Sequence, residues 1–333
     1  MKKIKKYLQI AISIVLLAVL VSWINIDQFL SSLQKTDYWY IGFAIVLMPV
    51  DRLLMAYKWN LLLKEKNIQI KLLEAFRIYY ISNFLGVFLP PTIGTDIVRA
   101  TYVAKQKFSI PDVIASILVE RLLGFLSLFI FGIYSIIIII TTIDSLYISP
   151  LDILLISILA TILFTLAFIF SFNSIISNII NYFIGLFKHK KYISKFSVKI
   201  QSLVNSYQSY KSRKITLILF FLLTLLEIFM AALVNYLIAV GLHADVSLIY
   251  FTAFIPLLMI VTRLPISLDG FGIKEGGSLY FLSLVGVPDA LGFSIGLLSH
   301  ILTLISVSPG GILYFIDQAK KKIVKEKIIE DEI

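Results

Sequence analysis

The chain of 333 residues is 59% hydrophobic and 15% charged, and its mean hydropathy is +0.93. This composition excludes a soluble globular protein and predicts one that uses lipid as its solvent. Cysteine is absent, which excludes disulfides, thiolate metal sites and cysteine nucleophiles. The three histidines are too far apart in sequence to suggest a metal site. We therefore expect no metal and no cofactor.

Six apolar segments are long enough to cross the hydrocarbon core of a bilayer, which takes about 20 helical residues. The first follows the basic sequence MKKIKK. Its apolar run is long and no small-residue cleavage motif follows it, so we interpret it as a retained span and not as a signal peptide. The expected spans lie near residues 7–26, 38–57, 112–140, 151–172, 215–241 and 290–316.

Lysine and arginine gather in alternate connections between these spans. Five lie in 58–77, eight in 173–214 and five after residue 317, whereas the three intervening connections hold only Lys35. The positive-inside rule then places both termini and the basic loop 173–214 on the cytoplasmic side of the cell membrane. Topology and attraction to anionic lipids account for most of the 30 basic residues, so the net charge of +10 requires no nucleic acid.

Two short segments resemble each other at an offset of about 175 residues. Residues 89–99 read LPPTIGTDIVR, and residues 264–275 read LPISLDGFGIKE. Each begins with Leu-Pro, continues with a hydroxyl residue and a glycine, and ends in charged residues. Each also follows an apolar arm, 76–88 or 249–262, that is too short to span a bilayer alone.

The charge pattern places the start of the first arm on the cytoplasmic side and the start of the second arm on the outside. Each arm must therefore enter the membrane, break at Leu-Pro and return to the side from which it came. We expect two re-entrant hairpins, near 76–111 and 249–288, arranged as an inverted repeat. Interrupted segments at matching positions of two halves indicate a transporter site near the midplane. A kinked ordinary span would explain Pro265 but not the charges after it. The whole chain, 1–333, is expected to form one all-α polytopic membrane domain with a cytoplasmic tail, 318–333.

Four basic residues lie within or beside the apolar segments, and each has an acid nearby in sequence. Ionisable groups in a span usually face the bundle interior or an aqueous cavity. Snorkelling at a helix end is the alternative, and we favour it for Arg52. Glu227, in mid-span, is expected to bond a neighbouring helix as a protonated side chain rather than carry protons, and His300 to be a hydrogen-bonded packing residue. The pairs are Arg52 with Asp51, Arg121 with Glu120, Arg263 with Asp269, and Lys274 with Glu275.

These motifs resemble those of the transmembrane region of lysylphosphatidylglycerol synthase/flippase proteins and their stand-alone relatives. The likeness runs from about residue 10 to about residue 316. The chain departs from the family pattern at Thr95, where a second glycine is more usual, and at Lys274, where arginine is common. The matching residues are Asn83, Leu89, Pro90, Gly94, Asp96, Arg99, Glu120, Arg121, Leu264, Pro265, Ile266, Ser267, Gly270, Gly272, Lys274, Glu275 and Gly276.

The resemblance implies translocation of a lipid headgroup across the cytoplasmic membrane. Bifunctional members carry a soluble synthase domain after the membrane region, whereas this chain ends in KKKIVKEKIIEDEI. We therefore expect a lipid flippase and not an enzyme. Its substrate would be a phospholipid, an aminoacyl-phospholipid or a polyprenyl-phosphate-linked lipid. No Gly-x-x-x-x-Gly-Lys-Ser/Thr motif is present, so ATP bound to this chain would not drive transport.

In this hypothesis a polar cavity between the hairpins holds the headgroup. Basic side chains would hold phosphate, and helix N-termini at Gly94 and Gly270 would add N–H donors. The acids would pair with those bases in the empty site, hold an amine, or carry a coupling proton. The expected substrate-binding residues, none of them catalytic, are Asn83, Pro90, Gly94, Asp96, Arg99, Glu120, Arg121, Arg263, Pro265, Asp269, Gly270, Lys274 and Glu275.

Other interpretations stay open. A membrane transferase or phosphatase would use Asp96 and Asp269 as metal ligands or bases. An accessory subunit in lipid-linked glycan or cell-envelope synthesis would dock a separate cytoplasmic synthase or glycosyltransferase through loop 173–214. That amphipathic basic loop is otherwise expected to lie on the anionic inner leaflet. Glu120 with its neighbour could form an interfacial helix-end pair, and Asn83 could bond only backbone.

Overall fold

The computed structural model is built of helices and turns, and the part of the chain that it describes contains no strand. Two predicted features lie outside that part: the first span, 7–26, and all but the start of the tail, 318–333. The described residues are 31, 34–89, 93–106, 108–142, 149–186, 191–264, 266–267 and 269–319.

Five of the described helices are long and apolar enough to cross a membrane. Runs of Leu, Ile, Phe and Val allow a helix to satisfy its own backbone while its side chains face lipid. These helices confirm five predicted spans, and the chain is an all-α polytopic membrane protein. They are α3 (Tyr38–Lys64), α6 (Ile110–Thr142), α7 (Pro150–Ser171), α10 (Lys214–Gly241) and α13 (Asp289–Val307), which helical residues 309–319 extend.

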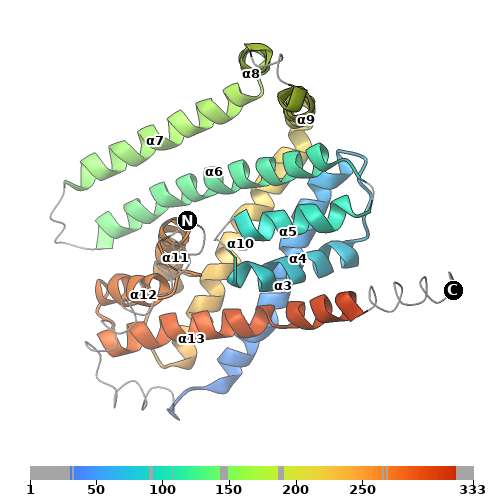
Figure 1. Cartoon of the computed structure of the whole chain (residues 1–333). Helices are drawn as coiled ribbons and strands as arrows, with labels where there is room; N and C mark the ends of the chain where they lie inside the picture. Colours follow the sequence, from blue (N-terminus) through green and yellow to red (C-terminus); the bar gives the residue numbers. More distant parts are fainter. Residues whose placement is uncertain are drawn as a thin grey trace, which may run out of the picture.

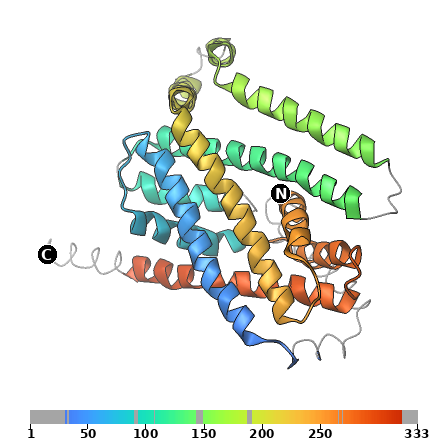
Figure 2. The same ribbon diagram turned by 180° about the vertical axis from the view of Figure 1, so that it is seen from behind.

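The helices α3 and α10 run antiparallel along each other and cross the molecule diagonally (Figures 1 and 2). Asp37 joins the start of α3 to the end of α10: its carboxylate accepts a hydrogen bond from Trp39 N at 3.1 Å, and its own N–H donates to the Gly241 carbonyl at 2.7 Å. On one side α6 packs against this pair, and α7 packs against α6. Most apolar side chains of α7 are exposed, as in a helix that faces lipid.

The chain folds back on itself twice, and each fold-back consists of two short helices. We call the pair α4 and α5 the first hairpin, and the pair α11 and α12 the second hairpin. In the first, α4 and α5 lie antiparallel side by side (Figure 1). The four helices are α4 (Leu72–Val87), α5 (Ile93–Ala104), α11 (Leu248–Thr262) and α12 (Ile273–Ser283).

The two hairpins start and finish at opposite ends of the bundle. Ile70, before α4, and Val103, near the end of α5, share one buried cluster with Trp59 near the end of α3. Val246 and Val287, which flank the second hairpin, share another buried cluster with the start of α3. Each hairpin therefore returns to the end from which it came, and their position in a membrane stays a prediction.

The helix that extends α13 packs across the first hairpin. After a turn at Ser308, the backbone of Gly310 lies so close to α4 that a Cβ there would be 2.1 Å from the Tyr80 carbonyl oxygen. Asp317, farther along, forms an ion pair with Arg77 of α4. The first hairpin is thus held by both α3 and the last described helix.

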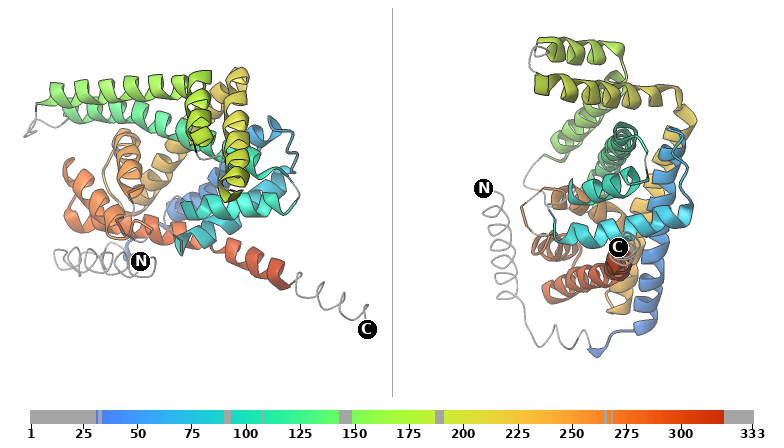
Figure 3. Two further views of the ribbon diagram at one scale, coloured as in Figure 1. Left: turned by 45° about the horizontal axis from the view of Figure 1, so that its top comes forward. Right: turned by 45° about the vertical axis from the view of Figure 1, so that its right-hand side comes forward.

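The predicted basic loop 173–214 is largely helical. Its helices α8 and α9 lie side by side at one end of the molecule (Figure 3). Tyr210, which is fully buried, donates a hydrogen bond to the Leu62 carbonyl at 2.8 Å and so ties this segment to the end of α3. The elements are α8 (Ser174–Leu186), α9 (Lys191–Gln208) and the 3-10 helix η1 (Ser209–Ser212).

Candidate functional site

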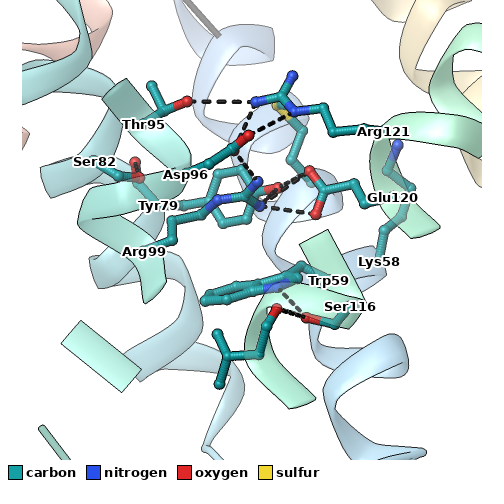
Figure 4. Close-up of polar contacts among 12 residues, drawn as sticks. Lys58, Trp59, Tyr79, Ser82, Thr95, Asp96, Arg99, Ser116, Glu120 and Arg121 are labelled. Carbon is teal, nitrogen blue, oxygen red and sulfur yellow. Dashed lines mark hydrogen bonds and ion pairs between the residues drawn. The ribbon is translucent and has the colours of Figure 1, made fainter. Parts of the chain in front are cut away.

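A buried ion-pair network joins the first hairpin to α6 (Figure 4). Its centre is Arg99 of α5, whose side chain is 2% exposed. One guanidinium nitrogen, Nη1, donates to both oxygens of Glu120 at 3.0 and 2.8 Å. The other, Nη2, donates to Asp96 Oδ1 at 2.7 Å. Asp96 and Arg99 are three residues apart on α5, so they share one face of the helix.

Aromatic rings and a second arginine complete this network. Arg121 donates to Asp96 through Nε at 2.9 Å and Nη2 at 2.7 Å, which is the strong two-pronged geometry. The Arg99 guanidinium lies 5.0 Å from the Trp59 ring and 4.6 Å from the Tyr79 ring. The Tyr79 hydroxyl donates to the second acid, Glu120, at 2.8 Å. Both terminal nitrogens of Arg99 are therefore used, and a phosphate would have to displace a carboxylate to reach them.

A second network lies where α12 begins, beside α13. His300 of α13 places Nδ1 2.7 Å from Glu275 Oε1 and Nε2 3.1 Å from Asp269 Oδ2. The other oxygen of Glu275 accepts a hydrogen bond from Gly272 N at 2.7 Å, and Lys274 Nζ lies 3.5 Å from Asp269 Oδ2. Glu275 and His300 have no exposed side-chain surface. Three predicted site residues thus meet around a histidine that was expected only to pack.

The helix start predicted at Gly270 lies three residues later. Gly270 and Gly272 have positive φ values of 81° and 82°, and α12 begins at Ile273. Positive φ is the conformation that glycine adopts without strain, so these glycines form the turn and not the helix. Asp269, with φ of 48°, shares this left-handed turn, which directs the chain toward His300.

A further charged pair, Lys58 with Glu227, was not predicted from the sequence. Because α3 continues to Lys64, Lys58 lies inside the helix and not in a cytoplasmic connection. Its side chain is 5% exposed, donates to Thr224 Oγ1 at 3.0 Å and forms an ion pair with Glu227 of α10. Glu227 does bond a neighbouring helix, as predicted, but its partner is a cation.

A cavity of about 270 Å³ lies between the two hairpins. Arg52 lines it from α3, at a position well inside the helix, so the interpretation of Arg52 as a snorkelling helix end is wrong. Three buried side-chain nitrogens of the lining residues find no hydrogen-bond partner within the described part of the chain: Arg52 Nε, Asn83 Nδ2 and Arg263 Nη1. The lining residues are Arg52, Asn83, Gly86, Val87, Thr95, Thr262, Arg263, Asp269, Lys274, Thr303, Leu304 and Val307.

Arg263 lies at the boundary between this cavity and a smaller one. The smaller cavity, of about 60 Å³, is also lined by Glu120, Arg121 and Glu227. The guanidinium of Arg263 lies 4.8 Å from the centre of the Phe125 ring. Across the described part of the chain no carboxylate comes within ion-pair distance of it. Arg263 is thus a half-buried cation that packs against an aromatic ring.

The remaining predicted site residues fall into two groups. Gly94 is in the first turn of α5, where a Cβ would lie 2.3 Å from Leu89 Cβ, so its role is close packing of the turn. Pro90 and Pro265 lie outside the described residues. Among those described, no group of three His, Cys, Asp or Glu side chains is arranged to hold a metal ion.

Residues 7–311 match the family model for the lysylphosphatidylglycerol synthase TM region. The chain belongs to this family. A UPF0104 membrane protein of Pyrococcus horikoshii is 27% identical over 130 residues, which cover 38% of this chain and 39% of that protein. The match to this relative spans less than half of either protein, whereas the family match includes both hairpins and both charged networks.

Proposed function

We propose that the protein translocates the anionic headgroup of a membrane lipid across the bilayer, through the cavity between its two hairpins. The observation that carries this proposal is the donor-rich lining of the cavity, in which Arg52 Nε, Asn83 Nδ2 and Arg263 Nη1 belong to lining residues and find no hydrogen-bond partner among the described residues. A buried donor without a partner costs about 1–3 kcal/mol, so its presence calls for an explanation. A phosphate supplies only acceptor oxygens, which match a lining rich in donors.

The charges of the lining support an anionic headgroup. Arg52, Arg263 and Lys274 face a single carboxylate among the lining residues, that of Asp269. A phosphate diester or monoester gains from this excess of cations, whereas the amines of a lysyl headgroup would meet them with like charge. The proposal therefore ranks phosphatidylglycerol and a polyprenyl phosphate above lysylphosphatidylglycerol. It assigns no catalytic residue and no cofactor.

The membrane placement is part of the proposal. The first hairpin would enter from the cytoplasmic face and the second from the opposite face, with both termini, α8 and α9 on the cytoplasmic side. The asymmetry of lysine and arginine supports this orientation. So do the opposite ends of the bundle at which the hairpins start and finish. The irregular turns of both hairpins would then lie at membrane depth around a polar cavity, where such backbone is tolerated.

Translocation is tested in proteoliposomes that hold the purified protein. Fluorescent phosphatidylglycerol, its lysyl form and a polyprenyl phosphate are offered separately, and accessibility to a membrane-impermeant quencher reports movement between leaflets. We expect R263Q to lower translocation about 10- to 100-fold, since it removes a charge-assisted hydrogen bond to phosphate. The matched control is R213Q, because Arg213 is 54% exposed and pairs with Glu65 on the surface, away from the cavity.

Two results would refute the proposal. One is a folded wild-type protein that moves none of the three lipids. The other is translocation that R263Q and R213Q affect equally. Either result would favour the accessory-subunit interpretation, in which α9 docks a cytoplasmic enzyme. Co-purification of such an enzyme, lost on deletion of basic residues from 191–208, would then be the next measurement.

A further inference from the structure

His300 lies between two carboxylates, and each ring nitrogen faces one of them. The distances are 2.7 Å from Nδ1 to Glu275 Oε1 and 3.1 Å from Nε2 to Asp269 Oδ2. The imidazole has no exposed surface, and its ring centre lies 4.0 Å from that of Phe271. We call His300, Asp269 and Glu275 the histidine triad.

Each of these two contacts has the length of a hydrogen bond, so each needs a proton between the ring nitrogen and the carboxylate oxygen. A neutral imidazole has one N–H donor and one lone pair. If both carboxylates were ionised, one contact would set the lone pair of the ring against an anion. The second oxygen of Glu275 is already occupied by the N–H of Gly272 at 2.7 Å, so this carboxylate is fixed and cannot turn away. The geometry therefore calls for one proton beyond those of a neutral imidazole and two carboxylates.

Asp269 connects this proton to the cavity between the hairpins. Its carboxylate belongs to the histidine triad and lines the cavity together with Lys274 and Arg263. A third cavity, of about 170 Å³, reaches His300 from the other side and shares Lys274 with the first. The triad thus lies in the wall between two hollow spaces, one of which is the proposed lipid site.

We propose that the histidine triad is the proton-coupling site of the transporter: it binds one proton together with the anionic headgroup and releases it when the headgroup leaves. This inference rests on the proposed function. An anion in the cavity makes the potential at Asp269 more negative and so favours the bound proton. Loss of the proton to water leaves one more negative charge beside the cavity and disfavours the anion. By linkage the two affinities change by the same factor.

The charges that face the triad are few. Lys274 of α12 is 3.5 Å from Asp269, and Arg52 and Arg263 line the same cavity as this carboxylate. The other packed elements contribute neutral groups to the space around His300, among them Asn235 of α10. All the flanking charges are positive, so the acids of the triad carry the negative charge that the proton compensates.

A single isosteric variant separates coupling from structure. In E275Q the amide oxygen can accept from Gly272 N while the amide nitrogen donates to His300 Nδ1. Both contacts of the ring are then made without the additional proton. We therefore expect E275Q to fold, to bind a headgroup without taking up a proton, and to lose its response to an imposed pH gradient.

Proton uptake is measured by calorimetric titration with a soluble short-chain phosphatidylglycerol in two buffers of different ionisation enthalpy. At a pH where the empty triad has lost its additional proton, we expect roughly one proton to be taken up per bound anion in the wild type, by linkage, and none in E275Q. The control H243Q removes a surface histidine whose Nε2 contacts the Lys35 carbonyl at 2.9 Å, and it should behave as the wild type. Binding of the anion by the wild type without proton uptake would overturn the coupling.

A second measurement needs no lipid. The chain has three histidines, so nitrogen NMR of labelled histidine in an H189Q/H243Q background reports His300 alone. At a pH below the one used for the calorimetry, we expect both ring nitrogens of the wild type to be protonated, and a single N–H in E275Q. One bare ring nitrogen in the wild type, together with carboxyl signals that show both acids ionised, would overturn the proton store even if lipid is translocated. If no lipid is translocated while both nitrogens are protonated, the proposed function fails and the triad is a structural ion pair.

Discussion

Lys58 and Glu227 lie 169 residues apart in sequence and form an ion pair between the two central helices, α3 and α10. The ammonium group also donates to Thr224 at 3.0 Å and lies 4.9 Å from the centre of the Phe220 ring. A buried charge is tolerated when its partner is present and is strongly unfavourable when it is not. Each residue of this pair therefore neutralises a charge that would be strongly unfavourable at its position if it were alone.

Removal of one member of the pair is expected to cost more than removal of both. K58M leaves the Glu227 carboxylate buried without a counter-ion, which costs about 3–5 kcal/mol. The double variant K58M/E227L replaces both charges by apolar groups and should recover most of that loss. Unfolding of the purified variants in detergent by denaturant gives the free energies. Equal destabilisation of the single and double variants would contradict the pairing.

Arg99 is expected to be essential for stability because it bonds two carboxylates while it packs against two aromatic rings. R99K keeps the charge but not the planar fork, so one of the contacts to Asp96 and Glu120 is lost. We expect a loss of about 2–4 kcal/mol in the free energy of unfolding. R213K, on the surface, should stay within about 0.5 kcal/mol of the wild type. Similar losses in the free energy of unfolding for R99K and R213K would contradict a special role of Arg99 in stability.

The opposite is expected for Arg263, whose Nη1 has no partner. R263Q removes a half-buried charge with no carboxylate in contact among the described residues, so the free energy of unfolding should rise by about 1–3 kcal/mol while translocation falls. The same denaturant titration, run beside the transport assay, checks this combination. A loss of stability would show that the guanidinium is held by structure and not kept for a ligand.

The first hairpin depends on a close contact between its helices. A Cβ on Gly86 would lie 2.3 Å from Thr95 Cγ2, so G86A forces α4 and α5 apart, at a cost of about 1–3 kcal/mol. Serine at 95 keeps the hydroxyl and lacks Cγ2. The double variant G86A/T95S should therefore regain thermal stability that G86A loses. If it does not, another neighbour limits the approach.

The order of the helices and the place of the candidate site between the two fold-backs were predictable, because each depends on local sequence. Long apolar runs identified the spans, and the repeated Leu-Pro blocks placed the fold-backs. The partners of the charges were not predictable. Glu120 and Arg121 are adjacent in sequence, but adjacent residues on a helix face different directions. Glu120 therefore pairs with Arg99, and Arg121 with Asp96.

Two important residues gave no usable signal. Lys58 follows an apolar run that ends at Tyr57, so hydropathy placed it in a connection, whereas tertiary packing carries the helix on to Lys64. His300 is a single histidine in an apolar segment, and its partners are contributed by the second hairpin, 25 and 31 residues earlier. Long-range contacts of this kind leave no period or spacing in the sequence.

The separation of Lys58 from Glu227 also has a consequence for synthesis in the cell. At about 5–20 residues per second, a ribosome adds the 169 intervening residues in roughly 10–30 s. During that time α3 exists without α10, and its lysine lacks the Glu227 carboxylate with which it pairs in the folded protein. The early helices must therefore wait near the insertion machinery, or at the membrane surface, until the second half of the chain arrives to neutralise them.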